Sequence, residues 1–175
     1  MKRLSLLTIL FACTLMNAGF WNKDEPDIKS IICGTEIFMK VLKDNFSLEE
    51  IYTGKPEERI NEVLNSDEEF SYWWTVDINK GHVYQVEDSN EFVTTVSRLN
   101  EIYFSWNDSK YIYFSEKKGN QIIITIHYFE KDLKIEENTE ILNLSKLTNT
   151  WTYEGEIGTD ECMLVPFPGI IQIKE

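Results

Sequence analysis

The chain has 175 residues, of which 13% are aromatic, and its formal net charge is −13 at pH 7. This composition excludes a disordered chain, and the length suits one domain that buries a core without external staples. The charge argues against nucleic acid as a partner, because no basic stripe is present to displace phosphate counterions. The negative net charge indicates either an acidic surface exposed to solvent or a binding partner that is a basic protein.

Residues 1–19 are typical of a secretory signal peptide. A short basic segment precedes an uncharged, mostly apolar run from Leu4 to Met16, and small and polar residues follow. This order predicts export. The alternative is an uncleaved membrane anchor, but Leu4 to Phe20 has 17 residues, and a spanning helix needs about 20 mostly apolar ones.

Two processing routes stay open for this signal. Cleavage after Ala18 or Gly19 would leave an unsuitable side chain at the −3 position, where a small residue is preferred. The segment from Leu10 to Cys13 resembles a bacterial lipobox, which would remove residues 1–12 and place a lipid on Cys13. A lipid at Cys13 would then hold the protein on a membrane without spanning it.

Two further cysteines, Cys33 and Cys162, lie near opposite ends of the mature chain. In an oxidising compartment such a pair is most simply a disulfide. The alternative is a catalytic thiol, which requires a histidine placed beside the sulfur. Neither His82 nor His127 has a recognisable link to a cysteine, so we predict a structural disulfide.

The mature chain is expected to contain a linker over residues 20–30 and one domain over 31–175, with helices in 27–65 and strands in 70–175. Apolar residues recur at spacings of three and four from Asp27 to Asp44, which predicts a helix. Pro56 favours the start of a second, short helix that ends near Asn65.

From Phe70 onwards the apolar period changes to two, which is typical of strands. Short strands joined by tight turns, with no long helix between them, predict an antiparallel arrangement. The fold class is therefore α+β, mainly β: an antiparallel β-meander, built as a sheet, sandwich or small barrel, preceded by one or two N-terminal helices. The predicted strands are Phe70–Ile78, His82–Glu87, Glu91–Val96, Glu101–Trp106, Tyr111–Glu116, Gln121–Glu130, Glu140–Leu144, Thr150–Glu156 and Ile170–Lys174.

Aromatic side chains supply the candidate binding surface. Alternation in the predicted strands places Trp73, Tyr103, Tyr111 and Tyr113 together on the more polar face of the sheet. Amphipathic aromatics on such a face can bind a sugar or a partner protein. The alternative is a second core layer beneath the helices, because aromatics in strands usually pack.

No motif for catalysis, a metal or a cofactor is recognisable. Asp77 and Asn79 resemble a fragment of a calcium loop, but its closing glutamate is missing, so we predict a hairpin turn with Gly81 at positive φ. His82 and His127 do not have the spacing of paired metal ligands. We therefore predict no catalytic residue, no metal ligand and no cofactor.

These observations predict an exported protein of the bacterial periplasm or cell envelope that binds a basic protein or a saccharide without catalysis. Contact with a membrane is expected only through a lipid at Cys13. One alternative is an inhibitor or immunity protein against a basic wall-degrading enzyme or toxin. Another is an enzyme acting on envelope polysaccharide, which would need two carboxylates in a cleft beside Trp73 or Tyr103.

Overall fold

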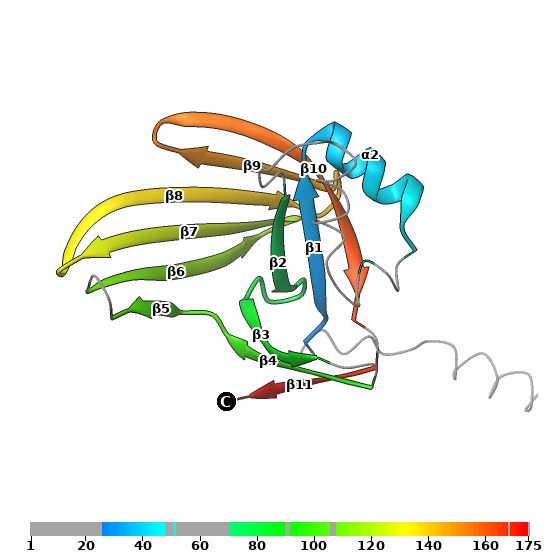
Figure 1. Ribbon diagram of the computed structural model, residues 1–175, viewed down its shortest axis with the longest axis horizontal. Coiled ribbons are helices and arrows are strands. Elements are labelled where there is room, and N and C mark those ends of the chain that lie inside the picture. Colours follow the sequence, from blue (N-terminus) through cyan, green and yellow to red (C-terminus); the bar gives the residue numbers. More distant parts are fainter. Residues whose placement is uncertain are drawn as a thin grey trace, which may run out of the picture.

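The computed structural model describes residues 26–47, 51, 71–89, 92–105, 108–167 and 169–174. This part of the chain forms one sheet of eleven strands and one helix (Figure 1). The elements are β1 (Ile28–Gly34), α2 (Glu36–Asn45), β2 (Ser71–Asp77), β3 (Val83–Ser89), β4 (Val93–Arg98), β5 (Glu101–Phe104), β6 (Ser109–Lys118), β7 (Gln121–Glu130), β8 (Leu133–Asn143), β9 (Thr148–Tyr153), β10 (Glu156–Pro166) and β11 (Ile170–Lys174). The prediction of a mainly β chain is confirmed. The predicted signal, Cys13 and the predicted helix from Pro56 to Asn65 lie outside the described residues.

The strand order in the sheet is β11-β4-β3-β2-β1-β10-β9-β8-β7-β6-β5. Two runs of consecutive strands, β2 to β4 and β5 to β10, are antiparallel meanders, as predicted. The sheet as a whole is mixed, because β11 pairs with β4 in parallel. The first strand, β1, lies in the middle between β2 and β10 and joins the two meanders.

The prediction of a helix from Asp27 to Asp44 is wrong in its first half, because residues 28–34 form β1. The last three residues of the predicted linker also belong to this strand. Nearly every side chain of β1 is buried, on both faces of the sheet. A short apolar run of this kind has no period that separates a doubly covered strand from a buried helix.

The helix α2 begins directly after β1, at a residue that the sequence pattern did not single out. Thr35 is the N-cap, and its Oγ1 accepts a hydrogen bond of 3.3 Å from the backbone N–H of Phe38. The helix buries Phe38, Met39 and Leu42 against one face of β1 and β10. No helix among the described residues is both long and apolar enough to cross a membrane.

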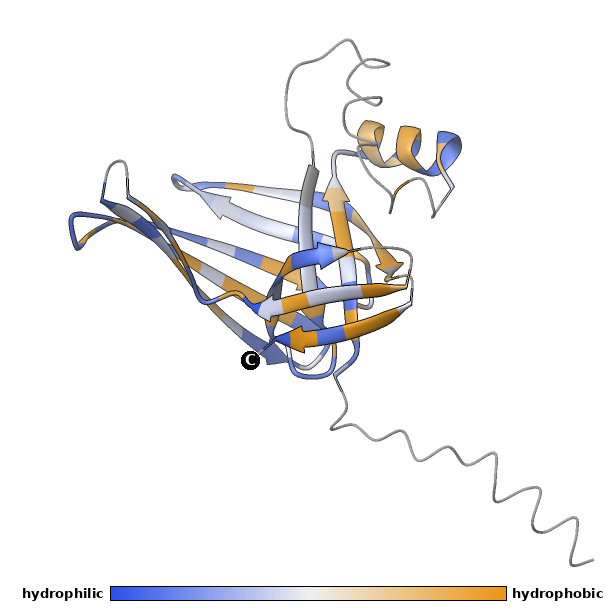
Figure 2. Cartoon of the chain, turned by 60° about the horizontal axis from the view of Figure 1, so that its bottom comes forward, coloured by the Kyte–Doolittle hydropathy of each residue, from blue (hydrophilic) through white to orange (hydrophobic). Residues whose placement is uncertain are grey.

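The sheet curls, so that strands far apart in its order approach one another (Figure 2). The strands β4 and β5, which lie near opposite ends of this order, are joined by Leu99 and Asn100 alone, and the carbonyl of Asn100 accepts a hydrogen bond from the N–H of Tyr113 in β6 at 2.8 Å. Lys117 Nζ in β6 donates to the carbonyl of Ile78, after β2, at 2.7 Å. We call the concave side, which carries Trp74 of β2, the inner face, and the side covered by α2 the outer face.

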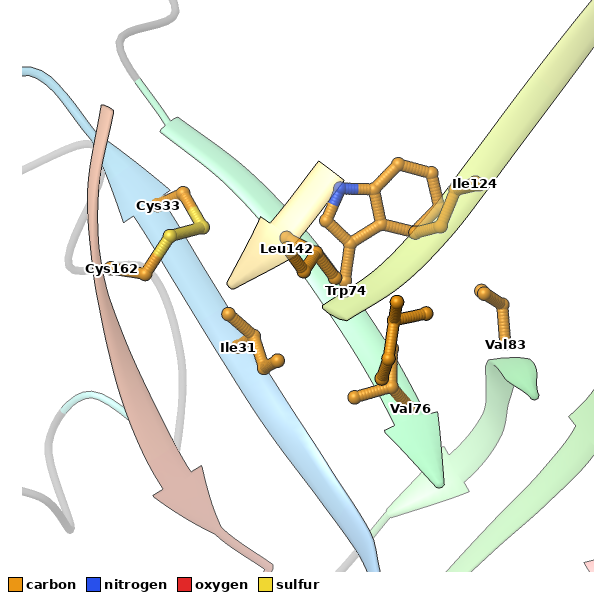
Figure 3. Packing of buried hydrophobic residues seen from close by; sticks show 9 residues of the cluster. Ile31, Cys33, Trp74, Val76, Val83, Ile124, Leu142 and Cys162 are labelled. Carbon is orange, nitrogen blue, oxygen red and sulfur yellow. A yellow bond between two sulfur atoms is a disulfide. The ribbon is translucent and has the colours of Figure 1, made fainter. Parts of the chain in front are cut away.

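The core of the inner face includes the disulfide, which lies at one side of the cluster (Figure 3). Cys33 of β1 lies opposite Cys162 of β10, and their sulfurs are bonded across a sequence separation of 129 residues, which confirms the predicted pair. Because both sulfurs are joined, the alternative of a catalytic thiol is wrong. The cluster contains Ile31, Cys33, Trp74, Val76, Val83, Ile122, Ile124, Leu142 and Cys162.

The turn between β2 and β3 has the predicted form. Gly81 has a φ of +75°, and its N–H donates to the carbonyl of Asp77 at 2.7 Å. Asp77 Oδ1 accepts further hydrogen bonds from the backbone N–H groups of Asn79, at 2.9 Å, and Lys80, at 3.1 Å. The turn is closed by its own backbone groups, as expected of a hairpin rather than a calcium loop.

Candidate functional site

The four aromatic residues predicted to share one face do not share it. Tyr111 and Tyr113 lie on the inner face, because β6 places them opposite Tyr128 and Ile126 of β7. Tyr103 points to the outer side, since its neighbour Ile102 is the residue paired with Tyr111. Trp73 is also on the outer side and is 42% exposed.

The prediction failed because both faces of β6 are apolar. Alternation separates Ile112 and Phe114 from Tyr111 and Tyr113, but it does not say which pair points inward. Only the register with β7 places the tyrosines inside. Tyr113 then contacts Trp74 across the curled sheet, with ring centroids 6.5 Å apart.

Trp73 borders a cavity of about 370 Å³ at the split between β2 and β3. These strands pair only through Thr75 with Tyr84 and Val76 with Val83. The described residues that line the cavity carry no formal charge: Ser30, Trp73, Trp74, Thr75, Tyr84, Gln85, Val86, Leu99 and Phe167. It therefore offers shape and apolar contact but no ionic interaction.

A second cavity, which we call the inner pocket, lies on β7, β8 and β9. Its volume is about 280 Å³, and it is lined by Ile126, Asn138, Glu140, Trp151, Thr152 and Tyr153. It forms because the inner face of β8 changes from Leu142, in the apolar core, to the polar Glu140 and Asn138 at alternate positions.

Glu140 places a carboxylate at the boundary between the core and the inner pocket. The residue is 7% exposed, and its Oε2 accepts hydrogen bonds from Trp74 Nε1, at 2.7 Å, and Asn149 Nδ2, at 2.8 Å. Burial raises the pKa of Glu140, while these two hydrogen bonds act in the opposite direction and the negative charge of Asp160 adds to the rise. Among the described residues, no cation pairs with this carboxylate.

Trp151 forms one wall of the inner pocket and is held on two sides. Its Nε1 donates to Asp160 Oδ2 at 2.9 Å. Its ring lies over Gly158, where an added Cβ would be 2.2 Å from Cζ2 of the indole. Burial raises the pKa of Asp160, and the hydrogen bond from Trp151 opposes that rise. Glycine at position 158 is therefore needed for the ring to lie where it does.

Negative charge also surrounds Tyr153, the other aromatic wall. The carboxylates of Glu136 and Glu154 raise the pKa of its hydroxyl, with a smaller contribution from burial. Three buried oxygens on the inner side of β8 and β9 have no hydrogen-bond partner among the described residues: Glu136 Oε1, Asn138 Oδ1 and Asn149 Oδ1. The site thus offers acceptors and negative charge, and no side chain in the described part of the chain supplies the opposite charge.

The remaining candidates for chemistry lie elsewhere. His127 is on the outer side of β7, against the ring of Phe114, and His82 follows the β2–β3 turn. In the part of the chain that the structure describes, no three His, Cys, Asp or Glu side chains converge in a way that could hold a metal ion. The buried Glu140 and the partly buried Asp160 lie beside Trp74 and Trp151, not beside Trp73 or Tyr103, and the buried Asp77 belongs to the β2–β3 turn.

Sequence reasoning missed the inner pocket, although it selected one residue beside it. Tyr113 lies next to the pocket through its pairing with Ile126, whereas Glu140 and Trp151 were not singled out. The signal in the sequence was the alternation of Asn138, Glu140 and Leu142, which becomes informative only when the register with β7 is known. Comparison with protein-family models, curated proteins and solved structures gives no match to this chain.

Proposed function

We propose that the chain is an exported, non-enzymatic binding protein of the bacterial envelope and that its partner is a basic protein. The observation that carries this proposal is the inner pocket, where the buried carboxylate of Glu140 lies between aromatic walls and forms no ion pair with any described residue. A buried charge is normally paired, so a partner that supplies the opposite charge on binding suits the site.

The charge of the whole chain supports the same partner. With a net charge of −13, the molecule attracts cationic proteins over long distances and repels acidic ones. The ion pairs that the described residues do form are at the surface, such as Lys43 with Glu161 and Lys110 with Asp132. They leave the carboxylates of the inner face for a partner.

Export is supported by the disulfide, since a stable bond between Cys33 and Cys162 is compatible with an oxidising compartment. The signal within residues 1–19 and a lipid at Cys13 belong to the proposal. An acidic protein of the envelope that captures a basic protein would act as an inhibitor or immunity protein if that partner were a wall-degrading enzyme or toxin.

A second candidate function is hydrolysis of envelope polysaccharide. It is favoured by two inner-face carboxyl groups with raised pKa values, the buried Glu140 and the partly buried Asp160. Each of them, however, already accepts a hydrogen bond from a tryptophan indole, which suits a fixed position more than proton transfer to a substrate.

Calorimetric titration of the mature protein with a cationic lysozyme tests the proposed function. We expect binding that weakens at least roughly tenfold from about 0.01 M to about 0.15 M salt, because the screening length falls from about 30 Å to about 8 Å. The control is the same lysozyme with its lysines succinylated, which we expect not to bind. Equal binding of both forms, or no binding of either at low salt, would contradict the proposal.

A further inference from the structure

We propose that the inner pocket binds one alkylammonium or guanidinium group, such as a lysine or arginine side chain, with Glu140 as its counter-ion. This inference rests on the proposed function and names the group through which the basic partner would be recognised. Three observations carry it: the geometry of the acceptors, the aromatic walls, and the lack of any ion pair between Glu140 and a described cation.

The carboxylate of Glu140 has one oxygen left for a ligand. Both hydrogen bonds that it accepts, from Trp74 and Asn149, end on Oε2. Oε1 has no partner among the described residues, and Glu140 lines the pocket. The buried core thus fixes one oxygen of the carboxylate and leaves the other for a donor that enters the pocket, where a charge-assisted hydrogen bond is strong.

The aromatic walls suit a cation with an aliphatic stem. The ring of Trp151 is fixed by its hydrogen bond to Asp160 and by contact with Gly158. Binding of a ligand therefore costs little side-chain entropy at this wall. Tyr153 is 50% exposed and forms the accessible side. Indole and phenol faces attract ammonium and guanidinium groups, and they also contact the methylene stems of lysine and arginine.

The polar atoms around the pocket favour a cation over an anion. Asn149 is fully buried and uses its amide N–H on Glu140, so its unpartnered atom is the acceptor Oδ1. Glu136 Oε1 is a second buried acceptor without a partner among the described residues. These acceptors and the carboxylate of Glu140 match a cation, which only donates hydrogen bonds. An anion would be repelled by the carboxylates.

Binding of a cation at this site is coupled to release of a proton. Burial raises the pKa of Glu140 above its ordinary value of 4.5, so this carboxyl holds its proton more strongly than an exposed glutamate does. A cation favours the ionised form, and the proton leaves to bulk water. The other titratable groups that face Glu140 are Asp160 of β10, whose pKa is also raised, and Tyr113 of β6, whose raised pKa keeps it neutral.

The other titratable groups near the inner pocket, among the described residues, are Tyr153 and its neighbours Glu136, Glu154 and Tyr111. The pKa of Tyr153 is raised, so it too stays neutral. Glu140 and Asp160, whose pKa values are raised, have to lose a proton before they attract a cation. The affinity for a cation is therefore expected to rise with pH above 4.5.

Titration of the full mature chain with n-butylammonium, followed by the indole N–H resonances of Trp74 and Trp151, tests this inference. We expect a saturable shift of both resonances, tighter at about pH 7 than at about pH 4.5. Glu140→Gln should weaken it at least about tenfold, because the charge-assisted contact is lost while the hydrogen-bond acceptor is kept. Glu161→Gln, which removes the same charge from the surface pair with Lys43, should leave the affinity unchanged.

The outcomes separate this inference from the proposed function. Loss of butylammonium binding in Glu140→Gln alone supports the inference whether or not lysozyme binds. Equal binding by Glu140→Gln and the parent chain, or equal binding of neutral 1-butanol, overturns it. Binding of an N-acetylglucosamine trimer in place of butylammonium also overturns it. Gly158→Ala is the second variant, for use if Glu140→Gln does not fold. Its added methyl group displaces the ring of Trp151, so butylammonium should bind more weakly. Unchanged affinity in this variant would contradict the inference.

Discussion

Replacing Cys33 and Cys162 together by alanine is expected to lower the free energy of unfolding by about 2–5 kcal/mol. The bond spans a sequence separation of 129 residues, so its loss gives the unfolded chain much more conformational freedom. It also joins β1 to β10 in the middle of the sheet, where the two meanders meet. Urea denaturation of the double variant and the parent chain measures the difference.

Reduction of the parent chain provides the control for this prediction. Its midpoint in urea with a thiol reductant should approach that of the double variant, whose own midpoint should not respond to the reductant. If the parent chain were as stable when reduced as when oxidised, and the variant equalled both, the disulfide would have no stabilising role.

Trp74→Ala is expected to lower the free energy of unfolding by about 3–5 kcal/mol. The indole is 9% exposed, packs in the inner core near Ile124 and Leu142 (Figure 3), and meets the ring of Tyr113 from the opposite side of the curl. Its removal leaves a large cavity. It also removes the hydrogen bond to Glu140 and so leaves a buried carboxyl with one donor fewer.

The neighbouring residue provides a matched control for Trp74. Trp73 is the same type of residue in the same strand, but it points to the outer side and is 42% exposed. Trp73→Ala should therefore cost clearly less than Trp74→Ala in thermal or urea unfolding. Equal losses for the two variants would contradict the assignment of Trp74 to the inner face.

The sequence predicted the strands whose alternation or turns are regular, and it failed where burial is two-sided. Gln121–Glu130 and Ile170–Lys174 were placed at their observed bounds, β7 and β11. The central strand β1 was assigned to a helix, since both of its faces are buried and no period of two is visible. The strand β10 was not predicted, because Gly158, Asp160 and Glu161 interrupt its apolar pattern.

The site was less predictable than the fold, because it depends on pairings between distant segments. Glu140 receives its hydrogen bonds from residues 66 and 9 positions away in the sequence. Alternation within β8 indicates which residues share a face with Glu140, but not that Trp74 and Asn149 meet it there. The disulfide was predictable because Cys33 and Cys162 are the two cysteines that follow the predicted signal, so each could pair only with the other.

Titration of the Glu140 carboxyl carbon by NMR, with and without n-butylammonium, tests most directly the claim that the inner pocket holds a cation. We expect the pKa of Glu140 to lie above 4.5 in the free protein, because the group is buried. Saturating butylammonium should lower that pKa, since the cation favours the ionised form. The same pKa with and without butylammonium would contradict the account.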